Sequence, residues 1–146
     1  MSRRTHSSDI TMKLMNGIHR AVLTISGGKL GWTLGRMPAV ELHTTGRVSG
    51  ITRSTMLTAP VHGHGSWVVV ASKGGDDHDP QWYRNLVSHP DAALTVRGRT
   101  LNVHTRTANA AEKAKLWPQI VAVNSRYAGY QLKTERDIPV VICDEY

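Results

Sequence analysis

Short apolar runs separated by turns recur along this chain, and they limit the folds open to it. Residues 39–42, 54–59 and 68–71 are three such runs, each of strand length and each close to a Gly, Pro, Ser or Thr. A chain of 146 residues is long enough for one domain with its own core, and it has no repeat, low-complexity segment or linker. The runs therefore predict an antiparallel or mixed β-barrel with a few helices.

The most informative stretch, residues 70–86, passes from an apolar strand through Ser-Lys-Gly-Gly and an acidic loop into a helix. Paired glycines let the backbone turn sharply or approach a ligand closely. We expect Asp79 as the helix N-cap and Pro80 as its first residue. A hydroxyl, a lysine and backbone amides then meet at one strand end, which suits an anionic ligand.

A second polar turn, T-T-G-R-V-S-G-I-T-R over residues 44–53, lies between two expected strands. Arg47, Ser49 and Arg53 place two guanidinium groups and a hydroxyl on this turn, a combination that suits phosphate or carboxylate. Taken alone, the motif is more simply read as a solvated hairpin with two surface arginines, because short motifs match by chance.

These two segments and a third block occur together in one order. T-T-G-R-x-S-G-x-x-R is followed by A-S-K-G-G and P-x-W-Y-x-N-L, and then by Trp117-Pro118, Tyr127, Tyr130 and a closing apolar run at residues 138–143. From Val40 to Cys143 the chain resembles the deazaflavin (F420)-dependent nitroreductase and quinone reductase family. The resemblance implies an α+β fold with a split β-barrel. It also implies coenzyme F420 and hydride transfer to a quinone, nitroaromatic or enone.

The resemblance also implies which residues form the site. Tyr127 and Ser72 match the polar contacts on the substrate side, and Tyr130 is a further candidate for catalysis. A tyrosine on a flexible segment supplies an aromatic wall and a polar donor, although Tyr127 and Tyr130 could simply cover the barrel. The expected cofactor-binding residues are Arg47, Val48, Ser49, Arg53, Ser54, Thr55, Met56, Ala71, Ser72, Lys73, Gly74, Gly75, Trp82 and Asn85.

Two positions depart from the family pattern. Many members carry Lys where this chain has Val48, so one cation for the cofactor tail is lost. Some quinone-reducing members carry an aromatic residue near Thr58, which is small here and predicts a wider substrate pocket. Both changes bear on the substrate class more than on the cofactor.

The formal charge of +7 and a pI of about 10.0 favour anionic partners. Nucleic acid is disfavoured because the basic residues are scattered and form no recognised binding motif. The phosphate and oligoglutamate tail of F420, which the resemblance implies, give the charge a better explanation. Two other readings stay open: a carrier that binds F420, a flavin or lipid without turnover, and an FMN-dependent reductase on the same barrel.

Residues 1–30 read as a basic amphipathic helix that precedes a single barrel domain at 31–146. This helix either packs on the barrel or lies on an anionic membrane surface. It is too short and too charged to span a bilayer, and it lacks the pattern of a signal peptide. The expected location is cytoplasmic, with peripheral contact at the inner face of the membrane as an option.

Other residue groups are weaker evidence for a functional site. His62-Gly-His64 and the acidic run at 76–79 contain metal-ligand types, but no second cluster completes a site, so we expect no metal. Cys143 stands alone on an apolar run and reads as a buried structural thiol. Residues 110–124 predict a helix capped by Asn109 and interrupted or bent at Trp117-Pro118.

Overall fold

The structure is a computed structural model, and it describes residues 37–146. Three predictions concern residues outside this range and stay predictions: the N-terminal helix, its contact with lipid, and the domain division at residue 30. Among residues 37–146, no helix combines the length and apolar character needed to cross a bilayer.

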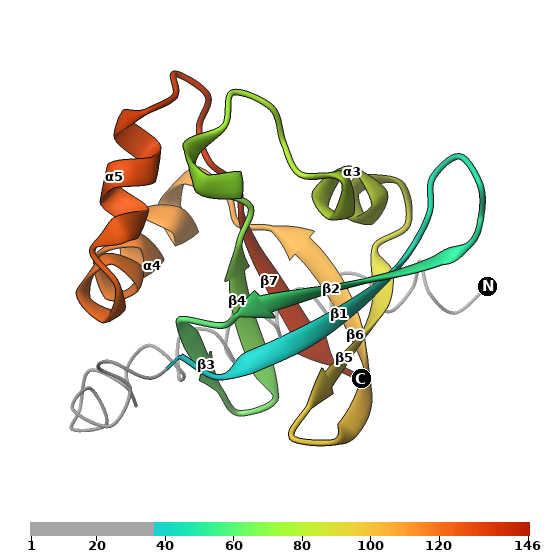
Figure 1. The fold of residues 1–146 in the computed structure, drawn as a ribbon. Coiled ribbons are helices and arrows are strands. Elements are labelled where there is room, and N and C mark those ends of the chain that lie inside the picture. Colours follow the sequence, from blue (N-terminus) through green and yellow to red (C-terminus); the bar gives the residue numbers. More distant parts are fainter. Residues whose placement is uncertain (1–36) are drawn as a thin grey trace.

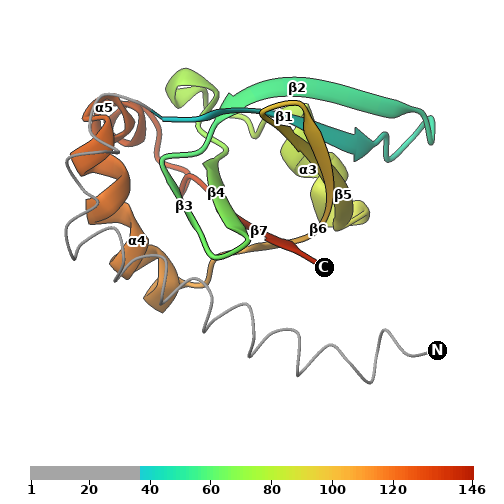
Figure 2. The ribbon, with the colours of Figure 1, turned by 90° about the horizontal axis from the view of Figure 1, so that it is seen from below.

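Seven strands form one antiparallel sheet in the order β2-β1-β5-β6-β7-β4-β3, which curls into an open barrel (Figures 1 and 2). The strands are β1 (Ala39–Thr45), β2 (Thr52–Thr58), β3 (Val61–Gly63), β4 (Ser66–Val70), β5 (Asp91–Val96), β6 (Arg99–Thr107) and β7 (Val140–Glu145). The helices are the short 3-10 turn η2 (Lys73–Gly75), α3 (Gln81–Ser88), α4 (Ala110–Val123) and α5 (Arg126–Leu132). This arrangement agrees with the expected α+β class and curled sheet.

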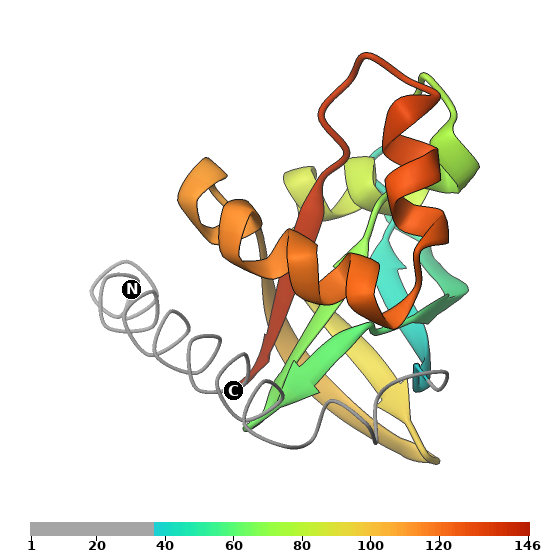
Figure 3. The same ribbon diagram turned by 90° about the vertical axis from the view of Figure 1, so that its left-hand side faces the viewer.

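Two hydrophobic clusters lie on opposite faces of β4 and β7. Val68, Val70 and Ile142 pack toward α4 and α5, which lie in front of these strands in Figure 3. Val69 and Cys143 point to the other side, into the interior of the barrel. Because both faces are covered, these strands are continuously apolar instead of alternating, which explains the unbroken runs in the sequence.

Helix α4 begins as expected, with Asn109 as its cap. The Asn109 side chain accepts from the Glu112 backbone N–H, and Glu112 reaches back to the Asn109 N–H, so a full capping box forms. An interruption or a bend is expected at Trp117-Pro118; the interruption is wrong, because the helix continues through Pro118 to Val123, and the bend stays a prediction. Leu116 and Ile120 are fully buried on either side of the proline, so tertiary packing outweighs the lost backbone hydrogen bond.

The start of α3 differs from the expectation by one residue and by its cap. Pro80 is the N-cap in an extended conformation, and Gln81 is the first helical residue. The Asp79 carboxylate accepts a charge-assisted hydrogen bond from Arg136 at 2.9 Å instead of capping the helix. Such a bond is stronger than a neutral cap, and no local pattern in the chain indicates this distant partner.

Candidate active site

Two hollows of about 600 and 700 Å³ lie next to each other along β2 and share Thr55 and Trp82 as lining residues; together they are called the groove. The arginine compartment is lined by Thr44, Gly46, Arg47, Val48, Ser49, Arg53, Ser54, Thr55, Gln81, Trp82 and Asn85. The tyrosine compartment is lined by Met37, Ala39, Thr55, Met56, Leu57, Thr58, Val70, Ser72, Lys73, Gly74, Pro80, Trp82, Asn124, Tyr127 and Tyr130. Strand β2 lies at the end of the described sheet and pairs with β1 alone, so the groove follows a sheet edge.

In the arginine compartment, α3 fixes the β1–β2 turn. Arg47 donates from its backbone N–H and from Nη1 to Asn85 Oδ1, at 3.1 and 2.9 Å, and from Nη2 to Gln81 Oε1 at 2.7 Å. The buried Asn85 side chain in turn donates to Thr44 Oγ1 at 3.3 Å. The oxygens that accept from the Arg47 guanidinium belong to neutral amides, so they orient it without neutralising its charge.

The remaining polar side chains of the turn have different surroundings. Ser49 Oγ accepts the Ile51 backbone N–H at 3.1 Å and thus stabilises the turn itself. Arg53 is exposed on β2 beside the groove, and Val48 is 93% exposed at its rim. Ser54 Oγ is hydrogen bonded to His43 Nδ1 at 2.7 Å. Arg47 and Arg53 are therefore the charged groups that this compartment offers an anion.

In the tyrosine compartment, the turn after β4 supplies Ser72, Lys73 and Gly74. Ser72 is buried, and Lys73 has a left-handed φ of 46°. Gly74 has a φ of 65°, and a methyl group there would meet open space. Gly75 differs, because a Cβ there would lie 2.8 Å from the Tyr130 carbonyl oxygen and 2.9 Å from Lys133 Cβ. Gly74 thus faces the groove, whereas Gly75 allows α5 to approach the turn.

Tyr127 and Tyr130 lie on α5 and meet edge to face, with ring centroids 6.0 Å apart. Tyr127 is buried, and its hydroxyl is hydrogen bonded to Thr58 Oγ1 at 3.1 Å and donates to Met37 Sδ at 3.8 Å. Burial raises the pKa of the Tyr127 phenol above its ordinary value, so the group is neutral near neutral pH. The segment has little apolar periodicity, yet Tyr127 lies on a helix and packs into the core beside Leu116 and Ile120. The flexibility expected of this aromatic wall stays a prediction.

Most residues expected at the cofactor site line the groove, but they divide between its two parts. Arg47 and Arg53 are in the arginine compartment, whereas Lys73 is in the other, so the three cations do not form one cluster. Two expected residues are not among the lining residues. Ala71 is fully buried with its N–H bonded to the Pro139 carbonyl, and Gly75 packs against α5.

Sequence reasoning missed several residues of the groove. Gln81 and Asn85 are four residues apart on one helix, and that spacing could have identified Gln81 as a second partner of the arginine turn. Thr58 was noted only as a small residue, yet its hydroxyl holds Tyr127. Met37, Leu57 and Asn124 carry no local signal, because only the fold brings them to the tyrosine compartment.

The other chemistry-bearing residues remain outside the groove. Within residues 37–146, no group of three or more His, Cys, Asp or Glu side chains is placed to hold a metal ion. Cys143 is buried, as expected, and burial raises the pKa of its thiol to about 12.

Comparison with known proteins decides the family. The model of the F420H(2)-dependent quinone reductase family matches residues 15–145. An F420H(2)-dependent quinone reductase of Mycobacterium tuberculosis is 38% identical over 130 residues, which is 86% of each chain. The chain belongs to the F420H(2)-dependent quinone reductase family. Coenzyme F420 is its cofactor, and it is an F420H2-dependent reductase with a small-molecule acceptor of the quinone type.

Solved structures confirm the fold. An F420-H2 dependent reductase has 35% sequence identity and a TM-score of 0.67, covering 73% of this chain and 94% of that one. A Clostridium acetobutylicum protein of the pyridoxinephosphate oxidase family has 13% identity and a TM-score of 0.56, covering 84% of this chain and 83% of that one. The second likeness concerns the fold alone. The split-barrel expectation drawn from the sequence is thus confirmed.

Proposed function

We propose that this F420H2-dependent quinone reductase binds its cofactor along the whole groove, with Arg47, Arg53 and Lys73 holding the anionic groups. The observation that carries the proposal is that the two compartments meet at Thr55 and Trp82, with cations in both. A small anion would reach one compartment only. A long ligand with a phosphate and an oligoglutamate tail at one side of its ring system suits both.

The arginine compartment suits the tail because its charge is oriented before binding. Arg47 is held by Asn85 and Gln81, so little side-chain freedom is lost when an anion arrives. Arg53 adds a second guanidinium from the exposed face of β2. Carboxylate and phosphate oxygens match the planar donor fork of both arginines.

The tyrosine compartment suits the acceptor because two hydroxyl groups and an apolar wall meet there. Reduced F420 supplies a hydride when bound, and negative charge then develops on an acceptor oxygen. Tyr127 and Ser72 can donate hydrogen bonds to that oxygen, and such bonds strengthen as the charge grows. Tyr130, Met37 and Leu57 complete the wall.

The hydrogen bonds that the Tyr127 hydroxyl makes with Met37 and Thr58 leave it able to donate to the acceptor oxygen. It donates to Met37 Sδ, and a thioether sulfur is a weak acceptor that a carbonyl oxygen easily replaces. Thr58 Oγ1 can donate to the phenolic oxygen from the other side, which leaves the phenolic proton free for the acceptor. Thr58 is thus expected to support Tyr127 rather than to widen the pocket.

The proposed site is tested by titrating the purified protein with F420, FMN and FAD while the summed tryptophan fluorescence and the cofactor fluorescence are followed. We expect F420 to bind at micromolar or lower Kd and to quench part of the tryptophan signal, because Trp82 lines both compartments. Equal or tighter FMN binding would contradict the site as described. Turnover of F420H2 with menadione, a nitroaromatic and an enone then ranks the acceptors, and absence of turnover with all of them would favour a carrier.

Membrane contact through residues 1–30 stays a prediction, because those residues lie outside the described part of the chain. Their basic amphipathic sequence is the only support for it. Sedimentation with vesicles of anionic lipid, compared with zwitterionic vesicles, tests it directly. Equal recovery of the protein from both supernatants would count against it.

A further inference from the structure

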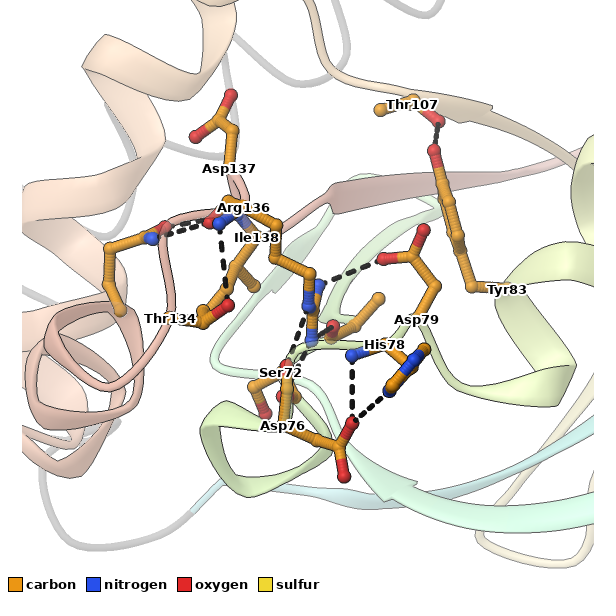
Figure 4. Close-up of polar contacts among 12 residues, drawn as sticks. Ser72, Asp76, His78, Asp79, Tyr83, Thr107, Thr134, Arg136, Asp137 and Ile138 are labelled. Atoms are coloured by element: carbon orange, nitrogen blue, oxygen red, sulfur yellow. Dashed lines mark hydrogen bonds and ion pairs between the residues drawn. The ribbon is translucent and has the colours of Figure 1, made fainter.

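Arg136 joins the connection between α5 and β7 to the turn that carries Ser72 and Lys73. Its Nη2 donates to the carbonyl oxygens of Ala71 and Ser72, at 3.2 and 2.9 Å, and its Nε donates to the Asp76 carbonyl at 2.7 Å. Its Nη1 donates to the Asp79 carboxylate at 2.9 Å. Figure 4 shows this side chain reaching down to Ser72, Asp76 and Asp79 from the opposite chain segment.

The backbone of Arg136 is itself held in place by residues at and just after the end of α5. The Arg136 backbone N–H donates to Thr134 Oγ1 at 3.3 Å, and Gln131 Nε2 donates to the Arg136 carbonyl at 2.8 Å. The Arg136 side chain is only 15% exposed. A rigid anchor therefore contacts three backbone carbonyls of one turn, which is more than a surface ion pair requires.

These contacts lie on both sides of Lys73, whose φ of 46° is uncommon for a residue with a side chain. Such a conformation persists only where its surroundings determine it. Arg136 binds the carbonyls of Ala71 and Ser72 before Lys73 and that of Asp76 after it. The backbone on each side of the strained residue is thereby fixed.

The same contacts set the direction of two amide groups. In a trans peptide the C=O and N–H point to opposite sides, and the described chain contains no cis peptide. Because the carbonyls of Ala71 and Ser72 point at Arg136, the N–H groups of Ser72 and Lys73 point away from it. Ser72 and Lys73 line the tyrosine compartment, so their orientation matters there.

We propose that Arg136 is a positioning residue for the F420 site: without touching the groove, it holds the 72–75 turn in the conformation that presents Lys73 and Ser72. This inference rests on the proposed placement of F420 in the groove. Arg136 is not one of the residues that line either compartment, so it acts through the turn.

The test compares Arg136→Ala with Arg106→Ala, a matched control. Arg106 is also a largely buried arginine, 20% exposed, and it pairs with Glu112 at 2.6 Å on a different part of the fold. Both variants lose a buried guanidinium and are expected to melt at lower temperature. The F420 Kd, measured by fluorescence well below both melting temperatures, separates a positioning role from a merely structural one.

We expect Arg136→Ala to raise the F420 Kd by about 10-fold or more, as for the loss of charged hydrogen bonds, and Arg106→Ala to change it by less than about 2-fold. Arg136→Lys keeps the charge but not the fork and is expected to recover part of the affinity. An unchanged Kd in Arg136→Ala, or an equal rise in Arg106→Ala, would overturn the inference. Should Arg136→Ala fail to fold, Arg136→Lys decides: its Kd is expected to rise several-fold, and an unchanged value refutes the proposal.

Lys73→Ala in the same titration keeps this inference separate from the proposed function. If Lys73→Ala binds F420 more weakly and Arg136→Ala binds it normally, the proposed site stands but Arg136 has no positioning role in it. If all three variants, Lys73→Ala, Arg53→Ala and Arg136→Ala, bind F420 normally, then F420 does not bind in the groove.

Discussion

The two compartments of the groove are built in opposite ways. The arginine compartment comes mainly from one turn between β1 and β2 and from one face of α3. The tyrosine compartment is assembled from β2, the η2 turn, α5 and single residues such as Met37 and Asn124. The first is a local motif whose chemistry can be read along the chain. The second exists only after distant segments have packed.

They also differ in their physical environment. Arg53 and Val48 are exposed to solvent, whereas Tyr127 is 7% exposed and Ser72 is 8% exposed. Electrostatic interactions with the exposed arginine compartment are weakened by water and salt. Hydrogen bonds to the buried Tyr127 and Ser72 in the tyrosine compartment are stronger and depend on exact partners. Cofactor affinity should therefore respond to charge at one end, and turnover to geometry at the other.

The largest expected effect comes from separating the walls of the tyrosine compartment with Gly75→Ala. The new methyl group would meet the Tyr130 carbonyl and Lys133 at a left-handed φ of 87°. Overpacking and the unfavourable φ together are expected to cost about 2–5 kcal/mol of unfolding free energy. Gly74→Ala is the control, because its φ is similar but its surroundings are open, and equal losses in urea denaturation would contradict the packing role of Gly75.

The next effect concerns the cations. Arg53→Ala and Lys73→Ala are each expected to weaken F420 binding by about 1–3 kcal/mol, and their effects should add because the residues lie in different compartments. Melting temperatures should change little for Arg53→Ala, since an exposed charge adds little stability. Arg99→Ala removes an exposed charge elsewhere and serves as the control in the fluorescence titration. If Arg99→Ala loses as much affinity as Arg53→Ala, the loss comes from the change in net charge and not from a contact in the groove.

At the buried end, Tyr127→Phe keeps the aromatic ring and removes only the hydroxyl. Turnover with menadione is expected to fall about 10-fold or more while the F420 Kd is preserved, as for loss of a transition-state hydrogen bond. Tyr130→Phe is the comparison, since its ring faces the same compartment. Unchanged turnover in Tyr127→Phe would exclude its hydroxyl, and a selective loss in Tyr130→Phe would assign the role to Tyr130.

A smaller expected effect is that the two compartments respond differently to ionic strength. Raising the salt concentration should weaken F420 binding several-fold, because the screening length falls to about 10 Å at 0.1 M. The KM for a neutral quinone should change little, because the quinone has no charge for salt to screen, even though Lys73 lines the tyrosine compartment. Parallel titrations and steady-state assays over a salt series check both. A salt-independent F420 Kd would argue that the tail does not lie near Arg47 and Arg53.

The smallest expected effect concerns pH. Burial raises the pKa of Tyr127, so turnover should show no loss from ionisation of this group up to about pH 10. The neutral phenol contributes stability below its ordinary pKa. That contribution declines as the pH rises above about 10 through the raised pKa, because the unfolded chain then binds fewer protons. Urea denaturation of wild type and Tyr127→Phe over a pH series checks this, and a constant difference across it would contradict the burial.

The sequence predicted the fold and the arginine turn well, since both rest on signals that lie close together in the chain. It did not predict the role of Asp79, because its partner Arg136 is far away in the sequence and a local helix cap was the simplest reading. It also placed Lys73 with the arginines, since the motif order contains no information on which part of β2 each turn reaches.

The helix that carries Tyr127 shows a different limit. Its segment has too few apolar residues to indicate a helical face, yet tertiary packing of Tyr127 against Leu116 and Ile120 fixes it. The hydrogen bond from Thr58 to Tyr127 joins residues 69 positions apart, so the support of the phenol could not be read locally. Long-range contacts of this kind define the buried half of the site.

The position of Cys143 has a consequence for a protein that handles quinones. Quinones and enones are electrophiles that alkylate thiolates, and a reductase meets them at every turnover. Cys143 is the one cysteine of the sequence, it is fully buried in the barrel, and its thiol has a pKa of about 12. Because the thiolate is the reactive form, this residue is shielded by burial and by protonation. The fold thereby protects the enzyme from covalent inactivation by its own acceptors.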